Sequence, residues 1–490
     1  MGEPVLLGLD CSTQSSTACA FTPSGRLLAR ASVPRAVRVP REGWAEQSPA
    51  GWSAGAVLAL RRAARLIGRR SVAAIGVAFQ RETFSLAGRD GRFLMPGILW
   101  LDTRASGEAA ALARGRAATS FRRLTGKALD ATCAGPRLAW MARHEPGLLS
   151  HSACFVDVGA ALSLALAGRF VTCVSGADTC GLVGLRNRKW LPELLPGKAR
   201  HLRFPELVEP GAVLGPLTDG AARATGLARG IPVVAAGGDG QVFALGAGAD
   251  RPGRGSLGLG TSVVLGLLTG RPVTSPAFRT LLLGPGAYLL EGVLQSGTWL
   301  LRWFTGAFGR PGLEDEAAWD AAAARIPPGS AGLRTIPHWR GVRFPESRPD
   351  ARGIVAGWSD RHTAAHFYRS LLEGTAFELK RLMAAMEADC PGRTERALRA
   401  GGGGMSSRIW PRMLAEVLGR PLVPAAGDAT ALGAAMWAAS GAGLFGSVRE
   451  SCAAMARNRP VIRPSAAGRR LYSSLYREWQ SVRRGSDPDN

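Results

Sequence analysis

The stretch VVAAGGDGQVFALGAG, at residues 233–248, joins three local patterns in one run. Its β-branched and small apolar residues predict a buried strand, its glycines predict a tight turn around Asp239, and the residues that follow are compatible with a helix. Glycines around a carboxylate let the backbone bend sharply and let a second molecule approach closely. A simpler interpretation is that Asp239 only caps the helix. The motif alone favours helix capping, but its position in the chain favours a functional role for Asp239.

Length and composition limit the fold before other motifs are considered. A chain of 490 residues is too long for one compact core and suits two domains of ordinary size. With 46% hydrophobic and 20% charged residues, it has enough apolar material for two cores. No apolar run approaches the length of a membrane span, and the N-terminus lacks the basic region of a signal peptide. We therefore expect a cytoplasmic protein with no membrane partner.

Cysteine usage and charge narrow the function classes. The 8 cysteines show no CxxC pair and no His/Cys cluster at zinc spacing, which is typical of unpaired thiols in a reducing cytoplasm. The formal net charge of +24 raises the question of nucleic-acid binding. The arginines are dispersed, however, and no basic stripe alternates with aromatic residues. We expect a surface that attracts anions in general, and no nucleic-acid partner.

A short internal repeat divides the chain. LLGLDCSTQSSTACAF at 6–21 and SLGLGTSVVLGLLTG at 256–270 both run from an apolar strand through Leu-Gly-Leu to a turn with Thr and Ser, and then into a second strand. A breaker-rich segment, RPGRG, lies at 251–255. This organisation predicts an N-terminal domain at 1–250, a C-terminal domain at 251–450 and a basic C-terminal extension at 451–490.

The rest of the pattern mixes strands and helices, as an α/β protein does. Strands are predicted at 5–10, 17–21, 27–33, 72–78, 98–100, 288–294, 397–400 and 422–423. Helices are predicted at 53–66, 108–114, 136–144, 152–167, 298–304, 362–388, 407–418 and 431–439, with a terminal helix within 461–490. Two halves that open alike suggest two domains around a cleft, with a hydroxyl-rich turn from each half gripping a phosphate chain.

Asp10 ends the first strand beside the hydroxyl-rich segment 12–17. A carboxylate there is well placed to hold Mg²⁺ next to bound phosphates, and the alternative is an Asx-type turn residue. Thr261 and Ser262 form the equivalent turn of the second half, where the alternative is a plain polar hairpin. The glycine run at 401–404 would let a flat ligand lie against the backbone, although such a run can also be only a flexible loop.

Polar residues also close two other apolar strands. Gln80, Arg81 and Glu82 together offer several directed hydrogen bonds, as polyhydroxylated ligands need; the alternative is a surface ion pair. Trp100 ends the next strand and is followed by Asp102. An indole face can pack against a sugar or polyol, and the alternative is a core tryptophan.

Taken in order, these motifs resemble the FGGY family of carbohydrate kinases. The resemblance covers residues 6–444 and is carried by LGLDCSTQSS, GWAEQSP, AIGVAFQRETF, GILWLDTRA, VVAAGGDGQ, SLGLGTS, HFYRSLLEGTAFEL and AGGGGMSSRIW. It implies an α/β fold of two actin-like, ribonuclease H-like ATPase domains that close on ATP, Mg²⁺ and a small sugar or polyol. A homodimer is compatible with the sequence, which does not determine the oligomeric state.

The resemblance also implies roles for individual residues. Asp239 resembles the catalytic base, and Asp10 resembles the magnesium-associated carboxylate. Residues implied to bind ATP are Asp10, Ser12, Thr13, Gly260, Thr261, Gly297, Gly402, Gly403 and Ser407. Residues implied to lie at the substrate are Gln80, Arg81, Glu82, Trp100, Asp102 and Gln241.

The motifs resemble two different subfamilies. The QRET segment resembles glycerol kinases, whereas LGTS, WAEQSP and the segment at 135–140 resemble xylulokinases. Thr132 stands where glycerol kinases carry a substrate-contacting tyrosine, Thr17 where they carry an arginine, and Arg137 replaces a lysine of the family. We therefore expect an ATP-dependent kinase of a ketose, most closely a pentulose such as xylulose. The alternatives are a glycerol or other polyol kinase, or an inactive nucleotide-binding regulator.

Overall fold

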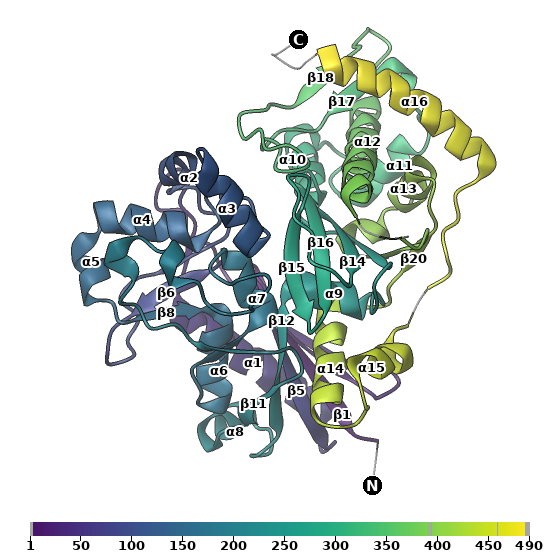
Figure 1. The fold of residues 1–490 in the computed structure, drawn as a ribbon. Coiled ribbons are helices and arrows are strands. Elements are labelled where there is room, and N and C mark those ends of the chain that lie inside the picture. Colours follow the sequence, from purple (N-terminus) through teal and green to yellow (C-terminus); the bar gives the residue numbers. More distant parts are fainter. Residues whose placement is uncertain (1–2, 391, 393, 458, 486–490) are drawn as a thin grey trace.

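The computed structural model describes residues 3–390, 392, 394–457 and 459–485 and contains two six-stranded sheets, one in each half of the chain (Figure 1). The first sheet has the order β11-β12-β5-β1-β2-β3. Its strands are β1 (Val5–Cys11), β2 (Ser15–Phe21), β3 (Leu27–Pro34), β5 (Val72–Phe79), β11 (Val213–Pro216) and β12 (Pro232–Gly238). The central strands are β-branched or small and almost fully buried, as expected of a sheet covered on both faces.

Five of the six strands of the second sheet repeat the arrangement of the first. The order of the second sheet is β15-β16-β14-β13-β19-β20, with strands β13 (Gly255–Leu259), β14 (Val263–Thr269), β15 (Arg279–Gly284), β16 (Ala287–Leu294), β19 (Leu398–Gly401) and β20 (Leu422–Pro424). In each sheet the first strand pairs antiparallel with its hairpin partner and parallel with a later strand. The repeat predicted from Leu-Gly-Leu is therefore confirmed, as is the two-domain α/β fold class.

Helices cover both faces of the first sheet. One face packs against α1 (Pro49–Ile67), α6 (Val158–Ala167) and α8 (Asp219–Thr225). The other face packs against α14 (Ala429–Gly441) and α15 (Val448–Met455), which come from the far end of the chain (Figure 1). The short α9 (Asp239–Gly246) also packs against α14. The two halves of the sequence are thus interleaved, because helices of the second half complete the first domain's core.

The remaining helices fall into two groups. Those packed on the second sheet are α10 (Thr298–Phe308), α11 (Glu316–Ala323), α12 (Ala364–Asp389), α13 (Trp410–Leu418) and α16 (Ala466–Gly485). Those of a side layer in the first half are α2 (Ser106–Leu112), α3 (Arg116–Thr125), α4 (Ala134–His144), α5 (Pro146–His151) and α7 (Val174–Ala177). The side layer also holds a four-stranded sheet of β4 (Glu46–Gln47), β7 (Gly97–Ile98), β6 (Phe84–Ala87) and β8 (Cys154–Asp157). Two pairs of short strands complete the fold, β9 (Val171–Cys173) with β10 (Glu206–Val208) and β17 (Arg334–Ile336) with β18 (Ile354–Ala356).

Several predicted elements have different bounds in the structure; the helix expected at 53–66, for example, begins at Pro49. The helix expected at 152–167 begins only at Val158, because β8 pairs with β6 and Asp157 then caps α6 by accepting from Ala160 N–H at 2.8 Å. The strand expected at 98–100 ends at Ile98, so Trp100 lies in the following turn. The helix expected from residue 407 begins at Trp410. Tertiary pairing and capping decided these boundaries.

The predicted basic extension is part of the second domain's core. α16 buries Tyr472, Leu475 and Trp479 beside α12 and α13, and the Trp479 indole N–H donates to the Thr335 carbonyl at 2.8 Å. In Figure 1, α16 lies across this domain as the yellow helix. Residues 486–490, the end of the predicted extension, lie outside the described residues.

Two further expectations, on cysteine pairing and on membrane-spanning helices, can be compared with the structure. Cys11, Cys19, Cys133, Cys154, Cys173, Cys180 and Cys452 form no disulfide. Among the described residues, we find no helix that is both long enough and apolar enough to span a membrane.

Glycines make the contact between α14 and the first sheet possible. A β-carbon added at Gly76 would overlap with the Ala434 carbonyl oxygen of α14, and one at Gly8 would overlap with the Ala431 carbonyl oxygen. We predict that Gly76→Ala lowers the free energy of unfolding of this domain by about 1–3 kcal/mol, as overpacking does. Chemical denaturation of the purified protein measures this change.

Gly107→Ala is the matched control, because a β-carbon at Gly107 in α2 meets nothing within 4 Å. It should leave stability unchanged or raise it by up to about 1 kcal/mol, since alanine favours a helix over glycine. Equal stability of the two variants would contradict the proposed role of Gly76.

Candidate active site

Asp239 is the first residue of α9, directly after β12. Gly237 has φ +116°, a conformation that strains any residue with a β-carbon, and Gly238 is the N-cap residue. The Asp239 Oδ1 accepts from the Gly240 N–H at 2.8 Å and lies 2.9 Å from Arg81 Nε. The predicted strand, glycine turn and helix start are confirmed, whereas the interpretation of Asp239 as a helix cap is wrong.

The environment of Asp239 suits a proton acceptor. Desolvation raises the pKa of its carboxyl group above the ordinary value, while the Arg81 guanidinium and the hydrogen bond from Gly240 oppose this shift. One third of the side chain, 33%, is nevertheless exposed. A carboxylate that is accessible and more basic than usual has the properties of a general base.

Four charged residues join the two domains beside Asp239, and we call them the interdomain ion cluster: Arg81, Glu82, Arg279 and Glu291. Arg81 Nη1 donates to Glu291 Oε2 at 2.8 Å, and Arg279 Nε donates to Glu291 Oε1 at 2.7 Å. Arg279 also forms an ion pair with Glu82. Although burial opposes ionisation, Arg279 and Arg81 lower the pKa of Glu291 to about 2, so Glu291 stays charged at neutral pH.

Glu82 is held in an unusual backbone conformation. Its φ is +52°, a left-handed value that costs a non-glycine residue about 1–3 kcal/mol. Its carbonyl oxygen accepts from Arg137 Nη1 at 2.6 Å, and Arg137 Nε donates to the Ala131 carbonyl at 2.9 Å. Arg137, which replaces a lysine of the family, is fully buried in α4. Arg137 therefore fixes the backbone of Glu82 through the Glu82 carbonyl oxygen.

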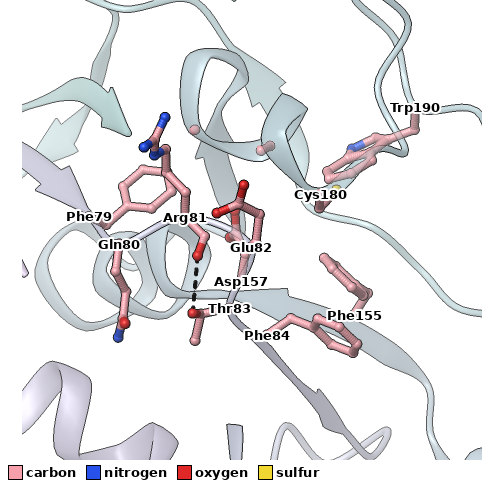
Figure 2. Close-up of a pocket in the computed structure, with 12 residues that line it drawn as sticks. Phe79, Gln80, Arg81, Glu82, Thr83, Phe84, Phe155, Asp157, Cys180 and Trp190 are labelled. Carbon is pink, nitrogen blue, oxygen red and sulfur yellow. Dashed lines mark hydrogen bonds between the residues drawn. The ribbon is translucent and has the colours of Figure 1, made fainter. Parts of the chain in front are cut away.

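Gln80 belongs to a hydrogen-bond chain rather than to the ion cluster. Figure 2 shows its side chain pointing away from those of Arg81 and Glu82. Gln80 Nε2 donates to Gln47 Oε1 at 3.0 Å, and its Oε1 accepts from Thr13 Oγ1 at 2.9 Å. Trp100 Nε1 donates to the same Thr13 hydroxyl at 2.9 Å. This chain connects two residues predicted at the substrate, Gln80 and Trp100, with a residue predicted at the phosphates.

Asp102, which was predicted at the substrate, forms several hydrogen bonds within the protein. It is buried, with 1% of its surface exposed, and it accepts from Ala45 N–H at 2.7 Å and from Arg104 Nε at 2.9 Å. Arg104 also pairs with Glu46 and stacks over Trp44 at 3.6 Å. The Asp102 oxygens are thus occupied within the protein. The ion pair of Asp102 with Arg104 holds the 43–49 loop in place, and the predicted contact of Asp102 with substrate stays a prediction.

Gln241 supports Arg81 from the first turn of α9. It is 1% exposed, its Oε1 accepts from Arg81 Nη1 at 3.2 Å, and its amide donates to the Ser175 carbonyl. Nearby, buried Asp178 pairs with Lys127 at 2.7 Å and accepts from the Leu282 N–H of β15 at 2.8 Å. The edge strand of the second domain is therefore docked onto the first domain next to the ion cluster.

Asp10 has the features of a cation-associated carboxylate. Within the part of the chain that the structure describes, its buried Oδ1 has no hydrogen-bond partner. Burial, followed by the carboxylates of Asp428 and Asp239, raises its pKa well above the ordinary value, and Arg35 opposes this. A divalent cation would relieve both the orphaned oxygen and the repulsion, so the residues present fit Mg²⁺. Among the described residues, no group of three or more His, Cys, Asp or Glu residues could hold a metal ion. Most ligands of a bound Mg²⁺ would therefore be water or phosphate oxygens.

The turns of the two hairpins lie as the repeat predicts. Ser12 and Thr13 lie between β1 and β2, and Gly260 and Thr261 lie between β13 and β14. Gly297, at the start of α10, contacts the second turn so closely that an added β-carbon would overlap with the Thr261 carbonyl oxygen. The three residues predicted at the phosphates in the second half are thus brought together.

The glycine run lies close in sequence to Ser406, which lines a cavity. Gly402 has φ +96°, and a β-carbon there would lie 2.6 Å from the Leu259 carbonyl oxygen, whereas the space around Gly403 is open. Ser407 accepts from the Trp410 N–H at 3.0 Å and so starts α13. Beside the run, a cavity of about 450 Å³ is bounded by Ser406, α10 and the loop before α11.

The far end of the candidate substrate site is built by both domains. Thr132 Oγ1 bonds Asp130 at 2.5 Å and accepts from Arg343 Nη2 at 3.0 Å. A cavity of about 10 Å³ lies among Asp130, Thr132, Arg279 and Arg343, and a second of about 10 Å³ is lined by Arg81 and Glu82 (Figure 2). Thr132, a position singled out in the sequence, thus lies next to the interdomain ion cluster.

Several site residues were missed by sequence reasoning. Arg279, Glu291 and Arg343 lie in the second half, yet they complete the site formed by the first half. Glu291 does carry a signal, since it is a single acid within the apolar run YLLEGVL. A charged residue in an otherwise buried strand calls for a partner. The sequence does not identify that partner.

Two family models match the chain. The N-terminal domain of the FGGY family of carbohydrate kinases matches residues 5–246, and the C-terminal domain of the same family matches residues 255–442. Among curated relatives, a glycerol kinase from Alkalilimnicola ehrlichii is 31% identical over 460 residues, covering 90% of this chain and 91% of the relative. A glycerol kinase from Thermus brockianus is 34% identical over 456 residues, covering 89% and 90%.

Solved structures show the same architecture. The xylulose kinase from Rhodospirillum rubrum superimposes with a TM-score of 0.87 at 28% identity and covers 99% of both chains. The Plasmodium falciparum glycerol kinase with ADP also has a TM-score of 0.87, and at 19% identity it supports the fold alone. Since the two family models together span almost all of residues 5–442, the chain belongs to the FGGY family of carbohydrate kinases.

Proposed function

We propose that this chain transfers the γ-phosphate of ATP to a hydroxyl of a short ketose, in the first instance a pentulose. The observation that carries the proposal is the accessible Asp239 carboxylate, which lies against Arg81 between the two domains. In the reaction, the acceptor hydroxyl gives its proton to Asp239 as its oxygen bonds to the γ-phosphorus. The bond from that phosphorus to the bridging oxygen breaks, and ADP leaves.

The surrounding residues have supporting roles in this proposal. Arg81 orients Asp239, and Gln241 in turn holds Arg81. Glu82 presents its carboxylate to acceptor hydroxyls, with Arg279 holding it from the second domain. Backbone N–H groups of the two hairpin turns, with Thr13 and Thr261, would bind the phosphates. Mg²⁺ held near Asp10 would neutralise phosphate charge that develops during transfer.

The choice of a pentulose rests on the far end of the site. Thr132 is short, and it stands where the resemblance places a tyrosine in glycerol kinases. The small cavity beside it lies among Asp130, Arg279 and Arg343, which offer hydrogen bonds to further hydroxyls of a longer chain. The solved xylulose kinase at 28% identity is in keeping with this choice.

Glycerol is the second candidate acceptor. It is favoured by the curated relatives that are glycerol kinases at 31–34% identity over about 90% of the chain, and by the QRET segment. A panel of ketopentoses, glycerol, other polyols and gluconate, followed by ADP release and by phosphorus NMR of the product, separates the two. ATP binding without any phosphorylated product would instead favour an inactive regulator.

We predict that Asp239→Asn lowers kcat by about 10²-fold or more, because the amide cannot accept the proton. The same coupled ADP-release assay measures this effect, with circular dichroism to show that the fold is kept. Asp219→Asn is a matched control, since Asp219 also begins a helix but is exposed on α8. Full activity of Asp239→Asn would overturn the assignment of the base.

The pH dependence of kcat/KM should reflect the protonation of the Asp239 carboxylate. Asp239 acts when deprotonated and its pKa is raised, so activity should fall as the pH decreases through a value above about 4. Arg81 lowers this pKa, and Arg81→Gln should therefore move the acid limb to higher pH. Arg92→Gln, at an exposed site, should leave the limb in place. An unmoved limb in Arg81→Gln would contradict the coupling.

Thr132→Tyr tests the chain length of the acceptor. The larger ring cannot fit within the cavity of about 10 Å³ beside Arg343, so it should extend toward the acceptor and lower kcat/KM for a pentulose by about tenfold or more relative to glycerol. Thr132→Ser keeps the hydroxyl and the hydrogen bonds to Asp130 and Arg343, so it should preserve the preference of the wild type. Equal losses for both acceptors in Thr132→Tyr would argue against a substrate chain that extends to this position.

A further inference from the structure

The linker between the two domains borders a separate cavity of about 330 Å³. We call it the linker cavity. The linker is residues 247–254, and it contributes Gly248, Arg251 and Arg254 to the wall. Arg399 of β19 and Arg449 of α15 complete the basic lining. The cavity shares no lining residue with the candidate active site or with the cavity beside the glycine run.

Positive charge exceeds negative charge in this cavity. Arg254 Nη1 pairs with Asp250 at 2.6 Å. The single carboxylate of Glu395 is shared by three arginines, lying 2.9 Å from Arg251, 3.3 Å from Arg254 and 3.5 Å from Arg399. With Arg449, four guanidinium groups therefore face two carboxylates.

Arg399 is largely buried within this excess of positive charge. Its side chain is 13% exposed, and its Nη2 lies 3.5 Å from Oε2 of Glu395. Burial, followed by repulsion from Arg254, lowers its pKa, and Arg251 adds to that repulsion. Arg254 and Arg399 are both largely buried, and holding such cationic groups together is unfavourable unless an anion joins them.

The backbone fixes the position of these groups. Gly248 has φ +97°, and a β-carbon there would lie 3.7 Å from Arg399 Nε, so the guanidinium packs over the glycine. Arg254 Nη1 also donates to the Gly248 carbonyl at 2.9 Å. The linker and two of the arginines are thus preorganised, which reduces the entropy lost when a ligand binds.

We propose that the linker cavity binds the dianionic phosphate group of a small molecule. Planar guanidinium groups match the oxygens of phosphate in pairs, and the net excess of two positive charges matches the charge of a phosphate monoester near neutral pH. The volume of about 330 Å³ lies within the range of small-molecule sites. The proposal does not depend on the kinase reaction, since none of these residues has a role in it.

An occupant would connect three elements. Arg251 and Arg254 belong to the linker that continues α9, whereas Arg399 belongs to the second sheet and Arg449 to the helix α15 that covers the first. α9 carries Asp239 at its opposite end. The bound phosphate group is therefore placed at the junction where the two domains connect.

Thermal unfolding with added ligand tests the proposal. The probes are inorganic phosphate and glucose 6-phosphate, with glucose and with potassium chloride at equal ionic strength as controls. All samples contain magnesium and a non-hydrolysable ATP analogue to occupy the catalytic phosphate turns. We expect the two phosphate probes to raise the unfolding midpoint and the controls to leave it unchanged. Stronger binding of glucose 6-phosphate would assign the site to a monoester, and equal binding would assign it to free phosphate.

The variant Arg399→Gln/Arg449→Gln should weaken binding of the phosphate probes by about tenfold or more, because two charge-assisted hydrogen-bond donors are removed. Arg92→Gln/Arg143→Gln removes the same charge at two exposed positions of the first domain and should keep wild-type binding. Arg449→Gln alone, at an exposed position, should show a smaller loss and serves if the double variant does not fold. Equal stabilisation of all variants, or an equal shift by potassium chloride, would overturn the site.

Discussion

The buried carboxylate of Glu291 is the interaction on which the candidate active site depends. It receives Arg81 from the first domain and Arg279 from the second, and it is inaccessible to solvent. Removing one partner of a buried ion pair costs about 3–5 kcal/mol, because the other charge is left uncompensated. Arg81 in turn contacts Asp239, so the orientation of the candidate base depends on a residue of the opposite domain.

A second constraint is the close approach of backbones at glycines. α14 comes from the end of the chain but lies on β1 and β5, where Gly8 and Gly76 leave room for its carbonyl groups. Gly246 of α9 and Gly433 of α14 form a similar contact. Because α9 begins at Asp239, the packing of α14 also supports the candidate base. Stability and function therefore use the same small residues.

Local patterns predicted much of the fold and part of the site. Alternation and turn chemistry located the central strands, and the repeated Leu-Gly-Leu turn predicted two similar sheets. Asp10 and Asp239 could be found because each lies next to a turn at the carboxyl end of a buried strand. Arg104, two residues from Asp102, donates hydrogen bonds to both oxygens of the Asp102 carboxylate. Sequence spacing does not reveal which polar atoms are already satisfied.

The sequence by itself determined the family, the order of the strands and the glycines and carboxylates at their ends, because these depend on residues that are close in the chain. Only the tertiary structure decided that Arg279 and Arg343 complete a site begun by Arg81 and Thr132, and that α14 covers the first sheet. These contacts join residues that are roughly 200 or more positions apart. Such pairs are selected by packing and by the need to neutralise buried charge, and neither leaves a local pattern in the sequence.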